Sequence, residues 1–137
     1  MNFMDAVRSG FNNYANFSGR ALRSEYWWWI VFNWIAAIVA GIIDRALGWG
    51  LYQTTMYGVQ QTVGPVATIV LLALFIPWLS VAVRRLHDTD RSGWWMLIGF
   101  VPIIGSLILL YFFVISGTPG PNKYGPPRDS SALAFPR

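Results

Sequence analysis

The sequence predicts an all-α, polytopic membrane protein with about three transmembrane helices, preceded by a short amphipathic helix in the membrane interface. Its 137 residues include three apolar windows of 18, 21 and 22 residues, at 26–43, 63–83 and 94–115. At about 1.5 Å of helical rise per residue, each window crosses or nearly crosses a hydrocarbon core about 30 Å thick. Every Lys, Arg, Asp and Glu lies outside these windows. A soluble chain of this length could not bury three helices that are apolar on every face.

The composition supports a membrane setting and narrows the chemistry. The chain is 55% hydrophobic and has eight Trp, several of which open the first and third windows, where aromatic rings sit at headgroup level. It has no cysteine, which excludes disulfides, thiolate catalysis and cysteine metal sites. The formal net charge is +4, but the basic residues flank the spans and do not form one patch. That distribution favours anionic phospholipids over nucleic acid as the counterpart.

The first 17 residues predict a short amphipathic helix. Apolar side chains recur there at spacings of three and four residues, which places them on one helical stripe: Phe3, Met4, Val7, Phe11, Tyr14 and Phe17. We expect this helix to lie in the interface with its aromatic face toward the lipid. The alternative is that it packs on the cytoplasmic end of the bundle.

The first window predicts a retained membrane anchor. It is longer than an ordinary signal-peptide core, is rich in Trp, and has no Ala-x-Ala exit followed by a soluble domain. Two pairs of small residues, Ala36 with Ala40 and Ala37 with Gly41, would allow another backbone to approach closely. The partner would be another span of this chain or a second copy in a homo-oligomer.

Glycine and proline residues shape the chain beyond the first window. The Gly-, Gln- and Thr-containing connection at 44–62 predicts a wet interfacial loop. Pro77 removes one backbone hydrogen bond in the second window, so the carbonyls near Ala73 become available to a neighbour or to water. Pro102 has a glycine three residues away on each side, which predicts a kink or a re-entrant hairpin in the third window. Residues 1–127 are expected to form one domain, and 128–137 a disordered tail.

Basic residues near the span ends predict the orientation. With three spans and a cytoplasmic N-terminus, six basic residues lie inside and four outside, which favours this arrangement. The two sets are Arg8, Arg20, Arg23, Arg84, Arg85 and Arg91 against Arg45, Lys123, Arg128 and Arg137. The C-terminus would then lie outside. A re-entrant third segment would instead put both termini and the main basic segment in the cytoplasm.

The segment RRLHDTDRSGWW at 84–95 is the candidate site. On a continuing helix, Arg84 would reach Asp88 at i,i+4 and Arg85 would lie near the same carboxylate, while Asp90 or Ser92 would cap the next helix. The lone histidine invites a general-base or metal interpretation, but no ligand set, nucleophile or phosphate loop accompanies it. A structural hairpin is the simplest interpretation. A headgroup site comes second, because arginine binds phosphate with two parallel hydrogen bonds.

Three motifs carry a resemblance to a known family. They are GRALRSEYW at 19–27, the 84–95 segment and GTPGPNKYG at 117–125. Together they resemble the small bacterial inner-membrane proteins grouped as domain of unknown function 805, over about residues 10–127. The resemblance implies a bacterial plasma membrane location and a multi-span helical fold, and it brings no activity, cofactor or substrate. Asp90 stands where this family commonly has glycine, which puts a tight turn there in question.

We therefore expect a non-catalytic integral membrane protein without a cofactor, whose polar network at the cytoplasmic interface contacts anionic lipid headgroups or a partner protein. The network residues are Arg20, Arg23, Glu25, Arg84, Arg85, His87, Asp88 and Arg91. A small-molecule carrier or channel component is the alternative, in which the two prolines would loosen backbone at membrane depth. A lipid-modifying enzyme with His87 as base is the third.

Overall fold

The computed structural model describes residues 1–50, 52–56 and 59–127, and the side chains of 52–56 and 59–62 lie outside that description. The expected disordered tail at 128–137 also lies outside the described residues. The elements in chain order are α1 (Phe3–Asn12), α2 (Arg23–Leu47), β1 (Tyr52–Met56), β2 (Val59–Val63), α3 (Pro65–Asp88), the 3-10 helix η1 (Gly93–Phe100) and α4 (Ile104–Val114).

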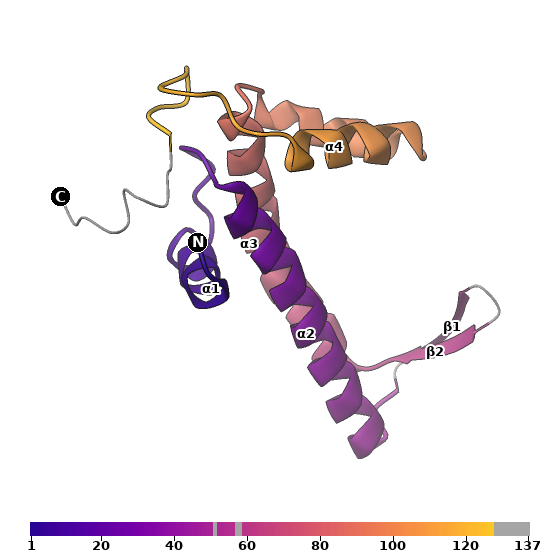
Figure 1. Ribbon diagram of the computed structural model, residues 1–137. Coiled ribbons are helices and arrows are strands. Elements are labelled where there is room, and N and C mark those ends of the chain that lie inside the picture. The colour runs from indigo at the N-terminus through magenta and orange to yellow at the C-terminus, as the bar shows by residue number, and fades with distance from the viewer. Residues whose placement is uncertain (51, 57–58, 128–137) are drawn as a thin grey trace.

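Helices α2 and α3 form a long antiparallel pair that is the axis of the molecule (Figure 1). They have 25 and 24 residues, are strongly apolar, and are each long enough to cross a membrane. Along most of their length, large apolar side chains such as Ile38, Ile42, Ile69 and Leu72 are exposed. The first two predicted spans are therefore present as helices, each extending beyond its apolar window.

Asp44 joins the two helices at one end of this pair. Its carboxylate accepts hydrogen bonds from the backbone N–H groups of Val66 (3.0 Å) and Ala67 (2.8 Å), in the first turn of α3. The residue before that turn is Gly64, which has no side chain to act as a cap, and a Cβ there would lie 2.2 Å from Asp44 Cγ. A side chain from α2 thus supplies the cap that the sequence around α3 lacks.

The connection between α2 and α3 contains a β-hairpin where the sequence suggested a loop. Strands β1 and β2 pair antiparallel, with Tyr52 opposite Val63 and Met56 opposite Val59. Strand β1 contains one Tyr and two Thr, and β2 contains two Val and one Thr, residue types that favour extended backbone. The all-α prediction is corrected to this extent.

The third apolar window is not one helix. It folds into η1 and α4, which pack against each other in a hairpin with its turn at 101–103. Ile103 has φ +66°, and a Cβ on Gly105 would lie 1.7 Å from the Ile98 carbonyl oxygen, so only glycine allows this approach. Each arm is about 16 Å long, too short to cross the membrane. A third continuous span is therefore not found, and the re-entrant alternative matches this geometry.

Helix α1 packs on the first half of α2 beside the start of the long pair (Figure 1). Phe3 meets Trp28 edge-on with ring centroids 5.7 Å apart, and Phe11 meets Trp29 at 5.4 Å. Gly10 lies flat against the Trp29 ring, where a Cβ would be 2.2 Å from a ring carbon. The helix thus packs on the bundle, as the alternative expectation had it.

Pro77 has the consequence expected from the sequence. The Tyr14 hydroxyl, just after α1, donates a hydrogen bond to the Ala73 carbonyl, four residues before the proline. Ser80, one turn further, donates to the Asn13 carbonyl at 3.0 Å. The carbonyl left without its helical partner therefore anchors the segment after α1 to α3.

Candidate functional site

Three segments far apart in the sequence meet at one end of the molecule: the lead into α2, the last turns of α3, and the loop after α4 (Figure 1). We call this the network end. It gathers all eight predicted site residues. It also holds most of the apolar core, in which Trp29, Val81 and Leu86 are fully buried. The β-hairpin lies at the opposite end.

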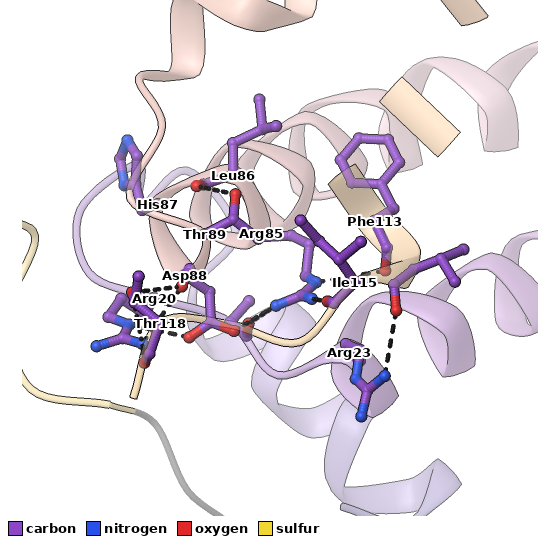
Figure 2. A network of polar contacts seen from close by, with 12 residues as sticks. Arg20, Arg23, Arg85, Leu86, His87, Asp88, Thr89, Phe113, Ile115 and Thr118 are labelled. Atoms are coloured by element: carbon purple, nitrogen blue, oxygen red, sulfur yellow. Dashed lines mark hydrogen bonds and ion pairs between the residues drawn. The ribbon is translucent and has the colours of Figure 1, made fainter. Parts of the chain in front are cut away.

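Asp88 is the centre of the first group of charges. Its carboxylate accepts from Arg20 Nε at 2.9 Å and from Arg85 Nη1, so one acid lies between two arginines (Figure 2). A Cβ on Gly117 would lie 2.0 Å from Asp88 Oδ2, which shows how closely the chain after α4 passes the carboxylate. All three charged side chains are at most 9% exposed.

Arg20 ties the loop after α4 to this carboxylate. Its guanidinium donates to the carbonyls of Thr118 (2.6 Å), Gly120 (2.8 Å) and Gly125 (3.4 Å), and to the Asp88 carbonyl at 3.3 Å. Because guanidinium donors are spread in a planar fork, one side chain can hold several loop carbonyls at once. The 117–125 motif is thus folded around Arg20.

The C-terminus of α4 is capped by side chains from the other two segments. Arg85 donates to the Ile115 carbonyl and to the Phe113 carbonyl (3.5 Å), and Arg23 donates to the Val114 carbonyl (3.1 Å). Figure 2 shows both guanidinium groups reaching this helix end. Trp27 Nε1 adds a bond to the Phe113 carbonyl at 3.2 Å. Cations at a helix C-terminus satisfy its last carbonyls and complement its dipole.

Arg84 belongs to a second group, on the side of the bundle where α1 packs. Its Nη1 lies 3.0 Å from Glu25 Oε1, with both side chains at most 1% exposed. Ser9 of α1 donates its hydroxyl to the same carboxylate oxygen at 2.6 Å. One carboxylate therefore links α1, α2 and α3.

His87 stacks flat on Tyr124, with ring centroids 3.9 Å apart and planes 4° apart. Its Nδ1 lies 2.9 Å from the Gly19 carbonyl oxygen, and its own carbonyl accepts from Asn122 Nδ2 at 2.9 Å. Among the described residues, no group of three or more His, Asp or Glu could hold a metal ion. These contacts give the histidine a place in the packing of the loop.

The turn after α3 contains Ser92, one of the two predicted helix caps, and Asp90, which stands where a glycine was expected. Ser92 Oγ accepts from the Trp94 N–H at 3.3 Å and so caps η1. Asp90 adopts φ +60°, a left-handed conformation in which aspartate is one of the better tolerated residues. Arg91 lies over the Phe112 ring at 4.1 Å, which ties the turn to α4. The tight turn therefore forms with aspartate in the position of glycine.

The predicted residues lie together in the structure, but one pairing differs from the prediction. The Arg85 contact with Asp88 is confirmed, whereas Arg84 pairs with Glu25 of α2. Ser9, Thr118 and the carbonyls of the 117–125 loop were not foreseen as members of the network. Ser9 is one of several polar residues in α1, and the 117–125 loop stands out only by its turn-forming residues. Neither feature indicates which side chain it would contact.

Comparisons with known proteins identify the family of this chain. The family model described as "Protein of unknown function (DUF805)" matches residues 14–126, which include all three motifs. The chain is 43% identical over 129 residues to the inner membrane protein YhaH of Escherichia coli K12, covering 90% of this chain and 95% of that protein. It is 47% identical over 114 residues to the inner membrane protein YhaI of the same strain, covering 82% and 86%.

A more distant relative is the uncharacterized protein YiiR of the same strain, 31% identical over 135 residues, with 80% of this chain and 84% of that protein covered. No solved structure matches the chain. The family match spans most of the chain and includes the residues that build the network end. The chain therefore belongs to the DUF805 family of proteins of unknown function.

Proposed function

We propose that this protein is a non-catalytic component of the bacterial inner membrane whose network end lies in the cytoplasm and binds anionic phospholipid headgroups. Helices α2 and α3 cross the bilayer, and α1 lies in the interface on the cytoplasmic side. The names of the relatives YhaH and YhaI support the membrane location.

The distribution of basic residues is the observation that carries this proposal. Among the residues that the structure describes, every Lys and Arg except Arg45 lies at the network end: Arg8, Arg20, Arg23, Arg84, Arg85, Arg91 and Lys123. Arg45 lies in the last turn of α2, at the other end. The two-crossing fold moves Lys123 to the same side as the N-terminus, so the excess of basic residues is larger than the sequence alone suggested. A positive excess marks the cytoplasmic side.

Burial divides these cations into two roles. Arg20, Arg84 and Arg85 are at most 4% exposed and donate to groups within the protein. Arg8, Arg23 and Lys123 are exposed at the surface of the same end, although Arg23 also donates to the Val114 carbonyl. The buried arginines therefore build the site, and the exposed cations are the groups that would meet phosphate, each adding roughly 1 kcal/mol to attraction by an anionic membrane.

Native mass spectrometry of protein released in gentle detergent from bilayers of phosphatidylglycerol and phosphatidylcholine tests this proposal. Arg8→Gln and Lys123→Gln, alone and combined, remove exposed cations that lie outside the buried ion pairs; Lys123 lies over the Tyr124 ring. Arg45→Gln is the matched control, since it removes one exposed cation from the other end.

We expect less retained phosphatidylglycerol with Arg8→Gln/Lys123→Gln and an unchanged amount with Arg45→Gln. Equal retention in all variants would overturn the headgroup proposal. A change in oligomer mass without a change in lipid would overturn it in favour of a protein partner. Arg84→Ala/Arg85→Ala is unsuitable here, because it removes buried ion pairs and would lower lipid binding through misfolding.

A further inference from the structure

The hairpin of η1 and α4 is apolar on nearly all its faces; it buries one side, with Leu109, Phe112 and Phe113, in the core and leaves the rest uncovered. Its large exposed side chains include Trp94, Phe100, Ile103, Ile104, Leu107 and Tyr111, each at least 60% exposed. A monomeric soluble surface rarely carries so continuous an apolar area. Something apolar must therefore cover these two arms.

The position of the hairpin limits what that can be. Both arms start from the network end: Gly93 lies against Val83 near the end of α3, and the last carbonyls of α4 are held by Arg85 and Arg23. In Figure 1 the arms run side by side from there, across the direction of α2 and α3, with their turn pointing away from the axis. The hairpin leaves and returns at the same end.

The chemistry changes along the hairpin. Its base contains a cation and aromatic rings, Arg91 over Phe112 and Trp95 edge-on to that ring at 5.4 Å. Its tip consists of Phe100, Val101, Pro102, Ile103 and Ile104. Tryptophan rings and cations prefer the headgroup level, whereas purely apolar side chains, phenylalanine included, prefer hydrocarbon.

The backbone at the tip is suited to hydrocarbon. The N–H groups of Val101, Ile104, Gly105 and Leu107 all donate to carbonyls within the hairpin, at 2.7–3.2 Å. Pro102 has no N–H to satisfy. Because unsatisfied backbone groups cost several kcal/mol in lipid, these four paired N–H groups lower the cost of bringing the turn toward the hydrocarbon.

We propose that the hairpin of η1 and α4 binds the acyl chains of a single leaflet, the one at the network end, and does not cross the bilayer. Its apolar surface continues that of α2 and α3, which faces the same hydrocarbon. With α1 packed at the same end, the protein has a larger cross-section in this leaflet than in the other. The inference rests on the crossing of the membrane by α2 and α3, but not on headgroup binding.

Spin-label accessibility in vesicles of phosphatidylcholine alone tests this inference, since that lipid removes anionic headgroup binding from the result. The native chain has no cysteine, so Ile104→Cys places a single label at the tip and Leu107→Cys a second one in α4. Ile38→Cys, exposed midway along α2, is the reference for the bilayer interior. Collision rates with oxygen and with a water-soluble nickel chelate give the depth of each label.

We expect the labels at 104 and 107 to collide readily with oxygen and little with the nickel chelate, at a depth shallower than the label at 38. High nickel collision at both sites would overturn the proposal, because the hairpin would then lie in water. Low collision with both reagents would overturn it by showing that a second copy or another protein covers the arms. A label at 104 as deep as the label at 38, or deeper, would overturn it by showing a crossing segment.

Discussion

Arg84 of α3 and Glu25 of α2 form a buried ion pair with 3.0 Å between Nη1 and Oε1. The pair lies in the first turns of α2 and the last turns of α3, the two helices proposed to cross the membrane. It fixes how these helices meet at the network end, and the Ser9 hydroxyl bonded to the same carboxylate adds α1 to the contact. This buried pair therefore stabilises the packing of α1, α2 and α3, whether or not a ligand binds at the network end.

Removing one partner of this pair should destabilise the protein more than removing both. Arg84→Met leaves the Glu25 carboxylate buried without its cation, a change that costs about 3–5 kcal/mol in comparable sites. Glu25→Leu/Arg84→Met removes both charges and should cost less than either Glu25→Leu or Arg84→Met alone. The free energy of unfolding of the native protein, the two single variants and the double variant is measured in mixed detergent micelles by titration with dodecyl sulfate. These four values form a double-mutant cycle. Strictly additive losses would contradict a direct pair.

Asp88→Asn should be among the most damaging single changes at the network end. It leaves Arg20 and Arg85 buried beside each other without the carboxylate between them, at a cost of about 3–5 kcal/mol. Asp90→Asn is the matched control, because Asp90 is exposed and asparagine tolerates its left-handed backbone. Similar unfolding curves for the two variants would contradict the central role of Asp88.

A charge reversal at Arg85 should not be rescued by reversal at Asp88. The new arginine at position 88 would face Arg20, whose Nε lies 2.9 Å from Asp88 Oδ1 in the native protein. The double variant Arg85→Asp/Asp88→Arg is therefore expected to unfold as readily as Asp88→Arg, judged by the same dodecyl sulfate titration. Recovery of native stability in the double variant would show an isolated pair of charges.

Gly105→Ala should loosen the hairpin of η1 and α4. Its Cβ would lie 1.7 Å from the Ile98 carbonyl oxygen, so the arms must separate, and overpacking of this kind costs about 1–3 kcal/mol. Gly41→Ala is the control, since nothing lies within 4 Å of a Cβ there. Limited proteolysis in micelles should cut the Gly105→Ala variant sooner between η1 and α4. Equal cutting of both variants would count against the close contact.

Tyr14→Phe should weaken the attachment of the segment after α1 to α3. It removes the hydroxyl that donates to the Ala73 carbonyl, and the loss of such a bond costs about 1 kcal/mol. In a Pro77→Ala background the helix supplies its own N–H to that carbonyl, so Tyr14→Phe should then have a smaller effect on the free energy of unfolding. An equal effect in both backgrounds would show that the Tyr14 hydrogen bond does not depend on the carbonyl that Pro77 leaves without a helical partner.

The sequence predicted the parts of this protein that local pattern controls. Length and hydropathy indicated α2 and α3, periodicity indicated α1, and the proline in α3 indicated the exposed carbonyl at Ala73. The segment at 84–91 was the candidate site because its charged residues are confined to a short connection between two apolar windows. It also predicted the Arg85 contact with Asp88, which depends only on helical spacing.

The sequence failed where long-range packing decides. The window at 94–115 is long enough to span, and Pro102 with its flanking glycines left a span and a re-entrant hairpin both open; the hairpin brings Gly105 close to Ile98. Arg84 had an acid within reach on its own helix, yet packing turns it toward Glu25. Asp44 looked like the polar end of a span, but it caps α3 across 22 residues of chain. Each outcome depends on a neighbour that spacing along the chain does not reveal.

The most direct test of two crossings is to determine on which side of the membrane the network end and the β-hairpin end lie. Single reporters at Ser18→Cys, Ser116→Cys and Gly50→Cys, all at exposed positions, can be labelled with a membrane-impermeant maleimide in right-side-out and inverted inner-membrane vesicles. With two crossings and a cytoplasmic network end, we expect labelling of positions 18 and 116 only in inverted vesicles and of position 50 only in right-side-out vesicles. Labelling of position 116 from the same side as position 50 would mean that 94–115 crosses the membrane, and would contradict this expectation.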